Sequence, residues 1–304
     1  MGLQNHLILR RPRRGRLEGR TDGWQHIATA LLGGILLGGS AAAQTGELVD
    51  RSELKVCADP NNLPYSDEKK EGFENKLAEL VAGELGKRVT YSWWAQRRGF
   101  VRSTLNAELC DAVMGVPVDY ELVETTRPYY RSTYVFVSRA GRNLDVASIK
   151  DARLNDLKIG VHLIGSDGMN TPPSLALGQR NIVQNVVGYM IYGDYREPDP
   201  PARLMEAVEK GDIDIAAAWG PLAGYAAKIS AVPLTVVPIT DTEDFAPLRF
   251  QFDIALGVRK GDHALKARLD DILARKQPEI RALLESYGVP LVQASSRAAE
   301  TGTR

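Results

Sequence analysis

The sequence is poor in the residues that most often hold metals and covalent cofactors. Its 304 residues include only four histidines and two cysteines. No Cys-x-x-Cys-His occurs, which excludes covalent haem attachment. Only His162 and His263 follow residue 43, so a histidine-rich metal site is not available there. We therefore expect neither a metal nor a cofactor.

Recognisable catalytic patterns are missing as well. The chain has no Ser-His-Asp set, no paired histidine ligands and no Walker loop. Glu74 and Asp59 remain as candidates for acid–base work. No basic stripe is interleaved with aromatic residues, so a nucleic-acid partner is not expected. The composition favours a binding protein over an enzyme.

The N-terminal apolar run is too short to span a bilayer. Six arginines at 10–20 precede an apolar, glycine-rich stretch at 27–39, and three alanines at 41–43 offer a small-residue cleavage site. A membrane span needs roughly twenty apolar residues, which disfavours the alternative of an uncleaved anchor. We predict a cleaved signal peptide over residues 1–43 and periplasmic localisation. No segment of the mature chain is expected to cross a membrane.

Removing the signal leaves a mildly acidic chain. The full sequence has 38 basic and 38 acidic residues; the signal contains six arginines, Glu18 and Asp22, which leaves 32 basic and 36 acidic residues. Export also bears on the cysteines. Cys57 lies in the first expected strand and Cys110 directly precedes another, so neighbouring strands would let them form a disulfide in an oxidising compartment. Two buried free thiols are the alternative.

Strand and helix patterns alternate along the mature chain, which predicts an α/β fold with open, mainly parallel sheets flanked by helices. The length of about 260 residues suits two domains. Expected strands are residues 54–58, 89–94, 110–116, 133–137, 157–161, 182–187, 213–218, 234–238 and 253–258. Expected helices are 73–85, 100–107, one from Ser174, 202–210, 264–275 and 278–287.

Several segments resemble the two-lobed, type II periplasmic solute-binding proteins for polar amino acids. They are CADPNNLPYS, GFENKLAELVAGELG, CDAVMGV, TRPYYRSTYVFV, LKIGV, AVEKGDIDIAAA and LESYGVP, within residues 53–291. The resemblance implies a chain that leaves the first lobe, builds the second and returns. We expect lobe one at 44–140 plus 251–292, lobe two at 141–250, and a disordered tail at 293–304.

Two charged ligand anchors of that family are missing. The arginine that grips the ligand carboxylate precedes the proline of the PYY motif by nine residues, where this chain has Asp119. The aspartate that faces the ligand ammonium is replaced by Trp219. A bidentate arginine has no neutral equivalent for holding a carboxylate. An ordinary amino acid is therefore not the expected ligand.

A narrower resemblance covers residues 54–137 and the segment AWGPLAGY at 218–225. LKVCADPNNLPYS, GFENKLAELVA, YSWWAQRRGFVRSTL, CDAVMGVP and TTRPYYRSTYVFV are similar to the periplasmic J proteins of methanol-oxidation operons. The resemblance implies an accessory protein for the maturation or activation of a PQQ-dependent methanol or alcohol dehydrogenase. The alternative is the solute receptor of an ABC transporter for a small, non-amino-acid ligand; an enzyme fits least.

Three groups of residues are candidates for a ligand-binding or partner-binding cleft. The loop after the first strand and the next helix start provide Asp59, Asn61, Asn62, Tyr65 and Glu74. The end of the second strand provides Trp94, Gln96, Arg97, Arg98 and Phe100, since tryptophan and arginine are enriched at interface hot spots. The remaining candidates are Tyr129, Arg131, Gly165, Ser166 and Trp219.

Each group has a plainer interpretation. Asp and Asn stabilise turns through their own backbone, which would explain Asn61 and Asn62. The tryptophans could alternate between buried and exposed positions, with solvated arginines beside them. Trp219 could serve core packing. The glycine turn at Gly165 resembles a family turn that meets ligand anions, but Asp167 would repel an anion there.

Overall fold

The computed structural model of the protein describes residues 52–164, 170–191 and 199–292. The predicted signal at 1–43, the predicted tail at 293–304, and Gly165 and Ser166 lie outside the described residues. Within those ranges, no helix combines the length and apolar character that a membrane span requires.

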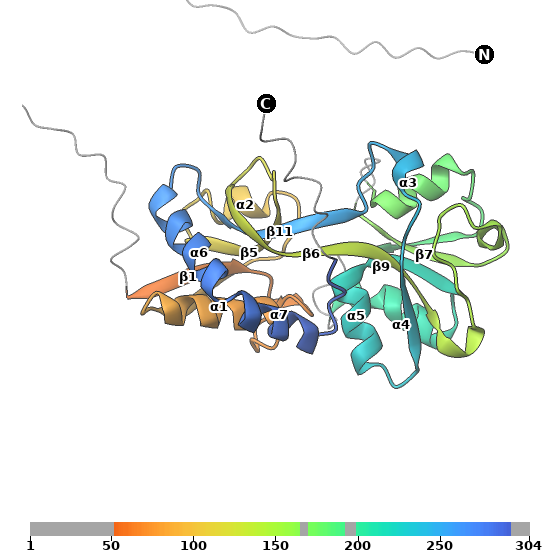
Figure 1. The fold of residues 1–304 in the computed structure, drawn as a ribbon, viewed down its shortest axis with the longest axis horizontal. Coiled ribbons are helices and arrows are strands. Elements are labelled where there is room, and N and C mark those ends of the chain that lie inside the picture. Colours follow the sequence, from red (N-terminus) through yellow and green to blue (C-terminus); the bar gives the residue numbers. More distant parts are fainter. Residues whose placement is uncertain (1–51, 165–169, 192–198, 293–304) are drawn as a thin grey trace, which may run out of the picture. The chain divides into compact units, whose positions relative to one another are not determined.

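Strands and helices alternate largely as predicted (Figure 1). The strands are β1 (Glu53–Ala58), β2 (Asn61–Asn62), β3 (Ser66–Asp67), β4 (Arg88–Trp93), β5 (Ala112–Pro117), β6 (Glu124–Arg139), β7 (Ile159–Leu163), β8 (Val186–Met190), β9 (Ile215–Trp219), β10 (Leu234–Pro238) and β11 (Gln251–Val258). The α-helices are α1 (Phe73–Glu84), α2 (Phe100–Ser103), α3 (Pro172–Gln179), α4 (Arg203–Lys210), α5 (Gly220–Ile229), α6 (His263–Arg275) and α7 (Gln277–Ser286). Short 3₁₀ turns are η1 (Ala140–Arg142), η2 (Ala152–Asn155), η3 (Pro200–Ala202) and η4 (Glu243–Phe245).

Two helices differ from the sequence-based expectation. The helix expected over 100–107 ends at Ser103, because the Thr104 backbone leaves helical geometry while its hydroxyl donates to the Phe100 carbonyl at 2.7 Å. Helix α5 was not expected, since its sequence GPLAGYAAKI is rich in glycine. Pro221 in its first turn is a helix-start signal, and Leu222 and Ala223 are buried on its inner face.

The strands follow the order β4-β1-β5-β11-β6-β9-β7-β8, with β10 also paired to β6. The strands β4, β1 and β5 are mutually parallel, and so are β9, β7 and β8. Between these two groups, β11 and β6 run antiparallel to their neighbours. The 16-residue strand β6 pairs first with β11 and then, from Tyr134 onward, with β9 (Figure 1). One strand therefore belongs to both halves of the sheet.

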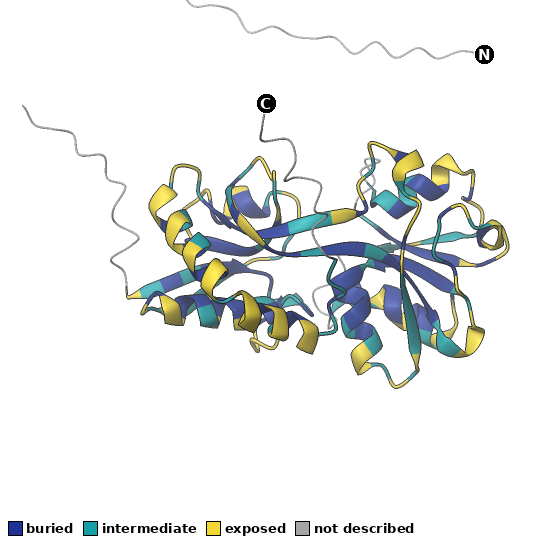
Figure 2. Cartoon of the chain, in the orientation of Figure 1, coloured by how far each residue is buried: buried dark blue, intermediate teal, exposed yellow. Residues whose placement is uncertain are grey.

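Each half is built as a sheet between helices, because alternate strand residues face opposite sides. In β1, Leu54 and Val56 pack with α1, α6 and α7, whereas Cys57 faces α2. Around β9, Ile215 packs toward α3, whereas Ala216 packs toward α4 and α5. Figure 2 shows the resulting pattern, with buried strands and exposed outer helix faces. The core thus forms separate apolar layers on both sides of the sheet.

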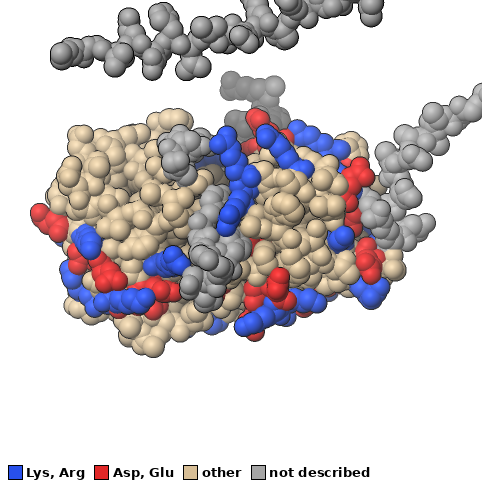
Figure 3. All heavy atoms as spheres, turned by 180° about the vertical axis from the view of Figure 1, so that it is seen from behind, with Lys and Arg blue, Asp and Glu red and all other residues tan. Residues whose placement is uncertain are grey.

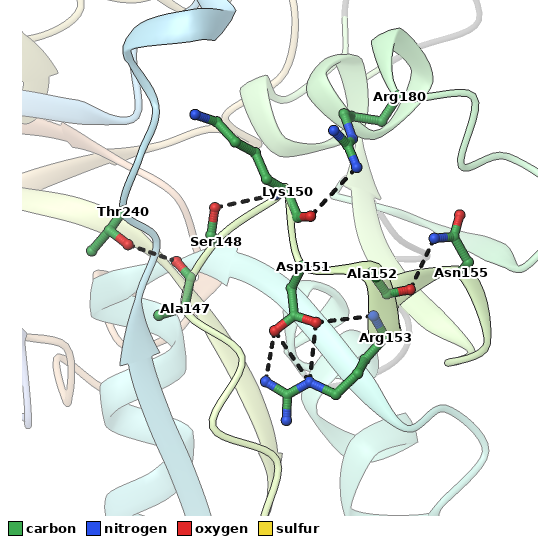
Figure 4. Close-up of polar contacts among 9 residues, drawn as sticks. All are labelled: Ala147, Ser148, Lys150, Asp151, Ala152, Arg153, Asn155, Arg180 and Thr240. Carbon is green, nitrogen blue, oxygen red and sulfur yellow. Dashed lines mark hydrogen bonds and ion pairs between the residues drawn. The ribbon is translucent and has the colours of Figure 1, made fainter.

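The segment that leads from β6 into β7 is tied down by polar contacts (Figure 4). The Thr240 hydroxyl donates to the Ala147 carbonyl at 3.2 Å, and Arg180, the C-cap residue of α3, donates to the Lys150 carbonyl at 3.4 Å. Asp151 caps the 3₁₀ turn η2 by accepting from the Arg153 backbone N–H at 2.9 Å. These bonds connect the start of the second half of the chain to β10 and α3.

The predicted disulfide is present between Cys57 and Cys110, whose Cα atoms are 5.5 Å apart. Both cysteines are buried in the small apolar cluster under α2, together with Phe100 and Val101. The bridge joins the end of β1 to the residues before the neighbouring strand β5. It therefore ties the intervening segment, which includes β4 and α2, to this part of the sheet. It closes a long loop, and disulfides across long loops restrict the unfolded chain most.

We predict that the double variant Cys57→Ser, Cys110→Ser is less stable than the oxidised protein by about 2–5 kcal/mol. Urea denaturation followed by circular dichroism checks this. The reduced wild-type protein is the matched control and is expected to lose a similar amount. An unchanged urea midpoint in both samples would show that the bridge adds nothing to the stability of this fold.

Candidate functional site

A cavity of about 370 Å³ lies at the carboxyl ends of several strands. Its lining comes from the residue after β1, the first turn of α1, the ends of β5, β7 and β9, the middle of β6 and the first half of β11. Open α/β sheets present their ligand crevice at this edge. The volume falls within the range of small-molecule sites, which is roughly 300–1,000 Å³.

Glu74 contributes a carboxyl group to the cavity from the first turn of α1. In the described part of the chain, no hydrogen bond or ion pair reaches this carboxyl group. Burial raises the pKa of Glu74 to about 8, and the negative charge of Asp59 adds to the shift. Glu74 is therefore mostly protonated at pH 7.

The position of Glu74 is set by its backbone surroundings. The Glu74 N–H donates to the Tyr65 carbonyl at 2.9 Å, which joins the loop after β1 to the helix start. On the opposite side, a Cβ atom added to Gly115 of β5 would lie only 2.0 Å from Glu74 Oε1. A side chain at position 115 would displace the Glu74 carboxyl group from its place, so Gly115 is part of the site's geometry.

Asp59 organises the loop at the mouth of the cavity. Its carboxylate accepts the Asn61 N–H at 2.9 Å and the Gln96 N–H at 2.6 Å. The Asn62 side chain donates to Gln96 Oε1 at 3.3 Å. Asp59 thus holds together the loops that follow β1 and β4, which explains why a buried acidic residue stands at a strand end.

Aromatic rings form much of the cavity wall. Trp219 lies with its ring centroid 5.2 Å from that of Tyr134 and 5.7 Å from that of Phe252, both edge-on. Tyr65 and Tyr130 line the same cavity and both contact Phe73 edge-on. Burial raises the pKa of both tyrosines well above its usual value, so their hydroxyls stay protonated. The wall is therefore apolar with a few hydroxyl groups.

His162 of β7 is a buried, neutral member of the lining. Burial lowers the pKa of His162 to about 4. Its Nε2 lies 3.1 Å from the Pro201 carbonyl oxygen, which identifies Nε2 as the protonated nitrogen. This histidine fills a structural position, because its ring nitrogen already has a partner.

Contacts between the two expected lobes enclose one side of the cavity. The Asp199 N–H donates to Asn61 Oδ1 at 2.8 Å, and the Leu63 N–H donates to Asp199 Oδ1 at 3.3 Å. The adjacent Pro201 is part of the cavity lining. Asn61 therefore takes part in a contact across the cleft, although it is not among the lining residues.

A second cavity of about 330 Å³ adjoins the first and shares Gln96, Gly115 and Pro117 with it. Its lining includes Arg97, Arg98, Phe100 and Arg102. Basic side chains also gather near the middle of the face in Figure 3. The two neighbouring cavities thus differ in character, since the first has acidic and aromatic lining and the second has basic lining.

The structure brings some of the predicted site residues together and separates others. Six of them line the first cavity: Asp59, Asn62, Tyr65, Glu74, Gln96 and Trp219. Arg97, Arg98 and Phe100 line the second cavity. Trp94 is 49 % exposed and lines neither.

Tyr129 and Arg131 of β6 do not belong to the lining of the cavity, whereas other residues of this strand do. Tyr129 is buried in the core, and Arg131 forms an ion pair with Asp253 of β11, with Nε 2.8 Å from Oδ1. Tyr130 and Tyr134 line the cavity. Strand alternation connects Tyr130 and Tyr134, because residues four apart on a strand share a face.

The cavity is also lined by residues that the sequence did not single out as site candidates. They are Gly115, Pro117, His162, Ile191, Pro201, Leu222, Phe252 and Ile254. Among the described residues, no group of three or more His, Cys, Asp or Glu side chains could hold a metal ion. The site has the lining of an apolar binding cavity with two carboxyl groups.

Comparisons with known proteins agree with this architecture. No family model matches the chain. Protein MoxJ of Methylorubrum extorquens is 33% identical over 258 residues, covering 81% of this chain and 84% of that protein. The crystal structure of periplasmic binding protein XoxJ from Methylobacterium extorquens AM1 is 36% identical with a TM-score of 0.66, covering 79% of this chain and 100% of that one. MxaJ from Methlophaga aminisulfidivorans MPT is 30% identical with a TM-score of 0.69, with the same coverage.

The predicted fold class is confirmed by these likenesses together with the strand order. The chain has the two-lobed α/β architecture of type II periplasmic binding proteins. The exact lobe boundaries stay a prediction, as does the assignment of individual residues to ligand or partner binding.

We predict that Glu74→Gln stabilises the protein at neutral pH. The pKa of Glu74 is raised from 4.5 to about 8, so the folded protein holds this proton more tightly than the unfolded chain does. The contribution of Glu74 to the free energy of unfolding is therefore most favourable below pH 4.5 and is lost as the pH rises to about 8. Removing the ionisable group should raise the free energy of unfolding on the order of 3 kcal/mol at pH 7 and far less at pH 5. Urea denaturation at both pH values measures the difference.

The matched control for this experiment is Glu79→Gln, an exposed glutamate on the same helix. It should leave the pH dependence of stability unchanged. An equal stability difference between wild type and Glu74→Gln at pH 5 and pH 7 would contradict the raised pKa.

Proposed function

The chain belongs to the MoxJ family, and from that premise we propose that it is a periplasmic, solute-binding-like accessory protein for a PQQ-dependent methanol or alcohol dehydrogenase. In this role it assists the maturation or activation of the dehydrogenase. Its direct partner is the dehydrogenase, and it is not itself an enzyme. The resemblance of residues 54–137 and 218–225 to J proteins of methanol-oxidation operons supports this role.

The observation that carries the proposal is the character of the main cavity. Trp219 occupies the place where amino-acid-binding relatives carry an aspartate, and its ring packs against Tyr134 and Phe252. Asp119, at the position of the carboxylate-binding arginine, lies on the surface with its side chain 76 % exposed. A cavity with an aromatic wall and without that pair of anchors suits a side chain of a protein partner better than a free amino acid.

The proposed location in the periplasm has two further supports. The layout of residues 1–43 is that of a secretory signal. The disulfide between Cys57 and Cys110 is typical of an oxidising compartment. Both are consistent with a partner that also works in the periplasm.

A second candidate function is that of a solute receptor for an ABC transporter. The observation in its favour is the enclosure of the cavity, in which Asn61 and Leu63 contact Asp199 across the cleft. Closure of this kind is how binding proteins retain small ligands. The missing amino-acid anchors limit this candidate to a small ligand that is not an ordinary amino acid.

Affinity purification from the periplasm of methanol-grown cells distinguishes the two candidates. The tagged mature protein should recover a quinoprotein dehydrogenase, and a strain lacking this gene should lose dehydrogenase activity. Intact activity without a recovered partner would favour the solute receptor, and a thermal-shift screen of ligands would follow.

We predict that Trp219→Ala impairs dehydrogenase activation by about tenfold or more without unfolding the protein, because it opens the aromatic wall and removes an anchor side chain. Dehydrogenase activity in complemented deletion cells measures the loss, and circular dichroism of the purified variant checks folding. Trp94→Ala is the matched control, since Trp94 is exposed and lines neither cavity. Normal activity with Trp219→Ala would argue against a role for the cavity in activation.

A further inference from the structure

The main cavity contains a carboxyl group that the described fold does not use. The Glu74 side chain faces the cavity and lies against Gly115, and no hydrogen bond or ion pair reaches its carboxyl group within the described part of the chain. A half-buried carboxyl group without a partner is unfavourable, and side chains in such positions usually meet a ligand. The carboxyl group therefore marks the place where a polar part of the ligand would lie.

The charged residues that line the cavity indicate the sign of the ligand's charge. Asp59 and Glu74 are the acidic members of the lining, and no Lys or Arg belongs to the described lining. An anionic ligand would be repelled by Asp59 and would find no cationic partner. A metal ion is also disfavoured, because hard cations require more oxygen ligands than two carboxyl groups supply.

The aromatic wall indicates the chemical class of the ligand. Four aromatic side chains without a cationic partner of their own in the described structure surround the cavity: Tyr65, Tyr130, Tyr134 and Trp219. Phe252 differs, since the Arg249 guanidinium already lies 5.2 Å from its ring centroid. Several aromatic faces beside a carboxyl group form the arrangement that binds organic ammonium groups through cation–π attraction.

We propose that the cavity binds an organic ammonium ion, seated against the Glu74 carboxylate and among the aromatic rings. The cation takes the place of the missing ion-pair partner of Glu74. The ammonium group comes either from a free amine or from a lysine side chain of a protein partner. The proposal deepens the proposed function by naming the ligand class of the same cavity, and it is tested by direct binding, which requires no dehydrogenase.

Proton release accompanies binding in this scheme. The groups that face Glu74 are the Asp59 carboxylate and the hydroxyls of Tyr65, Tyr129 and Tyr130. Burial and the charge of Asp59 disfavour ionisation of Glu74 in the empty cavity, whereas a bound cation favours it. Binding below pH 8 therefore releases a proton. The affinity for the cation rises by up to about tenfold per pH unit, until the pH is high enough that Glu74 is already ionised in the empty cavity.

Isothermal titration calorimetry of the mature protein tests the proposal with two matched pairs of probes. The first pair is choline and its uncharged isostere 3,3-dimethyl-1-butanol. The second is Nα-acetyl-lysine amide and Nα-acetyl-norleucine amide. The cation should bind about tenfold or more tightly than its neutral counterpart in at least one pair. Preference within the first pair assigns a free amine, and preference confined to the second assigns a lysine side chain.

Variants and buffers complete the test. Glu74→Gln should weaken binding of the cation by about tenfold or more at pH 8 and abolish the rise of affinity between pH 6 and pH 8. Glu79→Gln should leave both unchanged. Titrations in buffers of different ionisation enthalpy should show release of close to one proton at pH 6.5 in the wild type. Equal affinities for cation and neutral isostere in both pairs would overturn the proposal, even if the protein activates a dehydrogenase.

Discussion

The pairing of the long strand β6 with its neighbours is the constraint on which the rest of the structure depends. β6 pairs with β11 over its first part and with β9 and β10 over its second, so a single strand is hydrogen-bonded into both halves of the sheet. Because its residues alternate between faces, its register decides which side chains meet the cavity. The register with β11 shifts between Ile254, which faces Tyr130, and Ala255, which faces Pro128, and leaves Tyr129 as an extra residue. This bulge places Tyr129 in the core while Tyr130 faces the cavity.

Next to that strand, the site places two carboxyl groups, those of Asp59 and Glu74, in different hydrogen-bonding environments. Asp59 is buried but accepts backbone N–H groups from two loops, so its charge is stabilised by hydrogen bonds. Glu74 lies close to it without such partners, and burial raises its pKa to about 8. Only one of the two carboxyl groups in the cavity is supplied with donors. Glu74, which is mostly protonated at pH 7, is the group that a bound cation would ionise, and this couples the proposed binding to pH.

The family relationship and the geometry of the cavity bear on function in different ways. Membership of the MoxJ family links the chain to methanol oxidation, whereas the geometry of the cavity limits the chemistry that a partner or a small ligand must present. The aromatic wall around Trp219 suits an apolar body. The carboxyl group of Glu74 in the same cavity is the part that we propose to meet a cation.

The sequence by itself determined the alternation of strands and helices and the position of the loop after β1, and it placed Cys57 and Cys110 where neighbouring strands would let them pair. These features follow from local patterns, namely apolar periodicity and turn residues. Tertiary structure alone decided that Tyr130 and Tyr134 line the cavity while Tyr129 and Arg131 do not, that α5 forms from a glycine-rich segment, and that Glu74 lies against Gly115. These depend on a bulge, on burial against other elements and on the approach of segments about 40 residues apart in the chain, as with the Glu74 side chain and Gly115. Local propensity carries no information on such contacts, because the energies that decide them arise only when distant segments pack together.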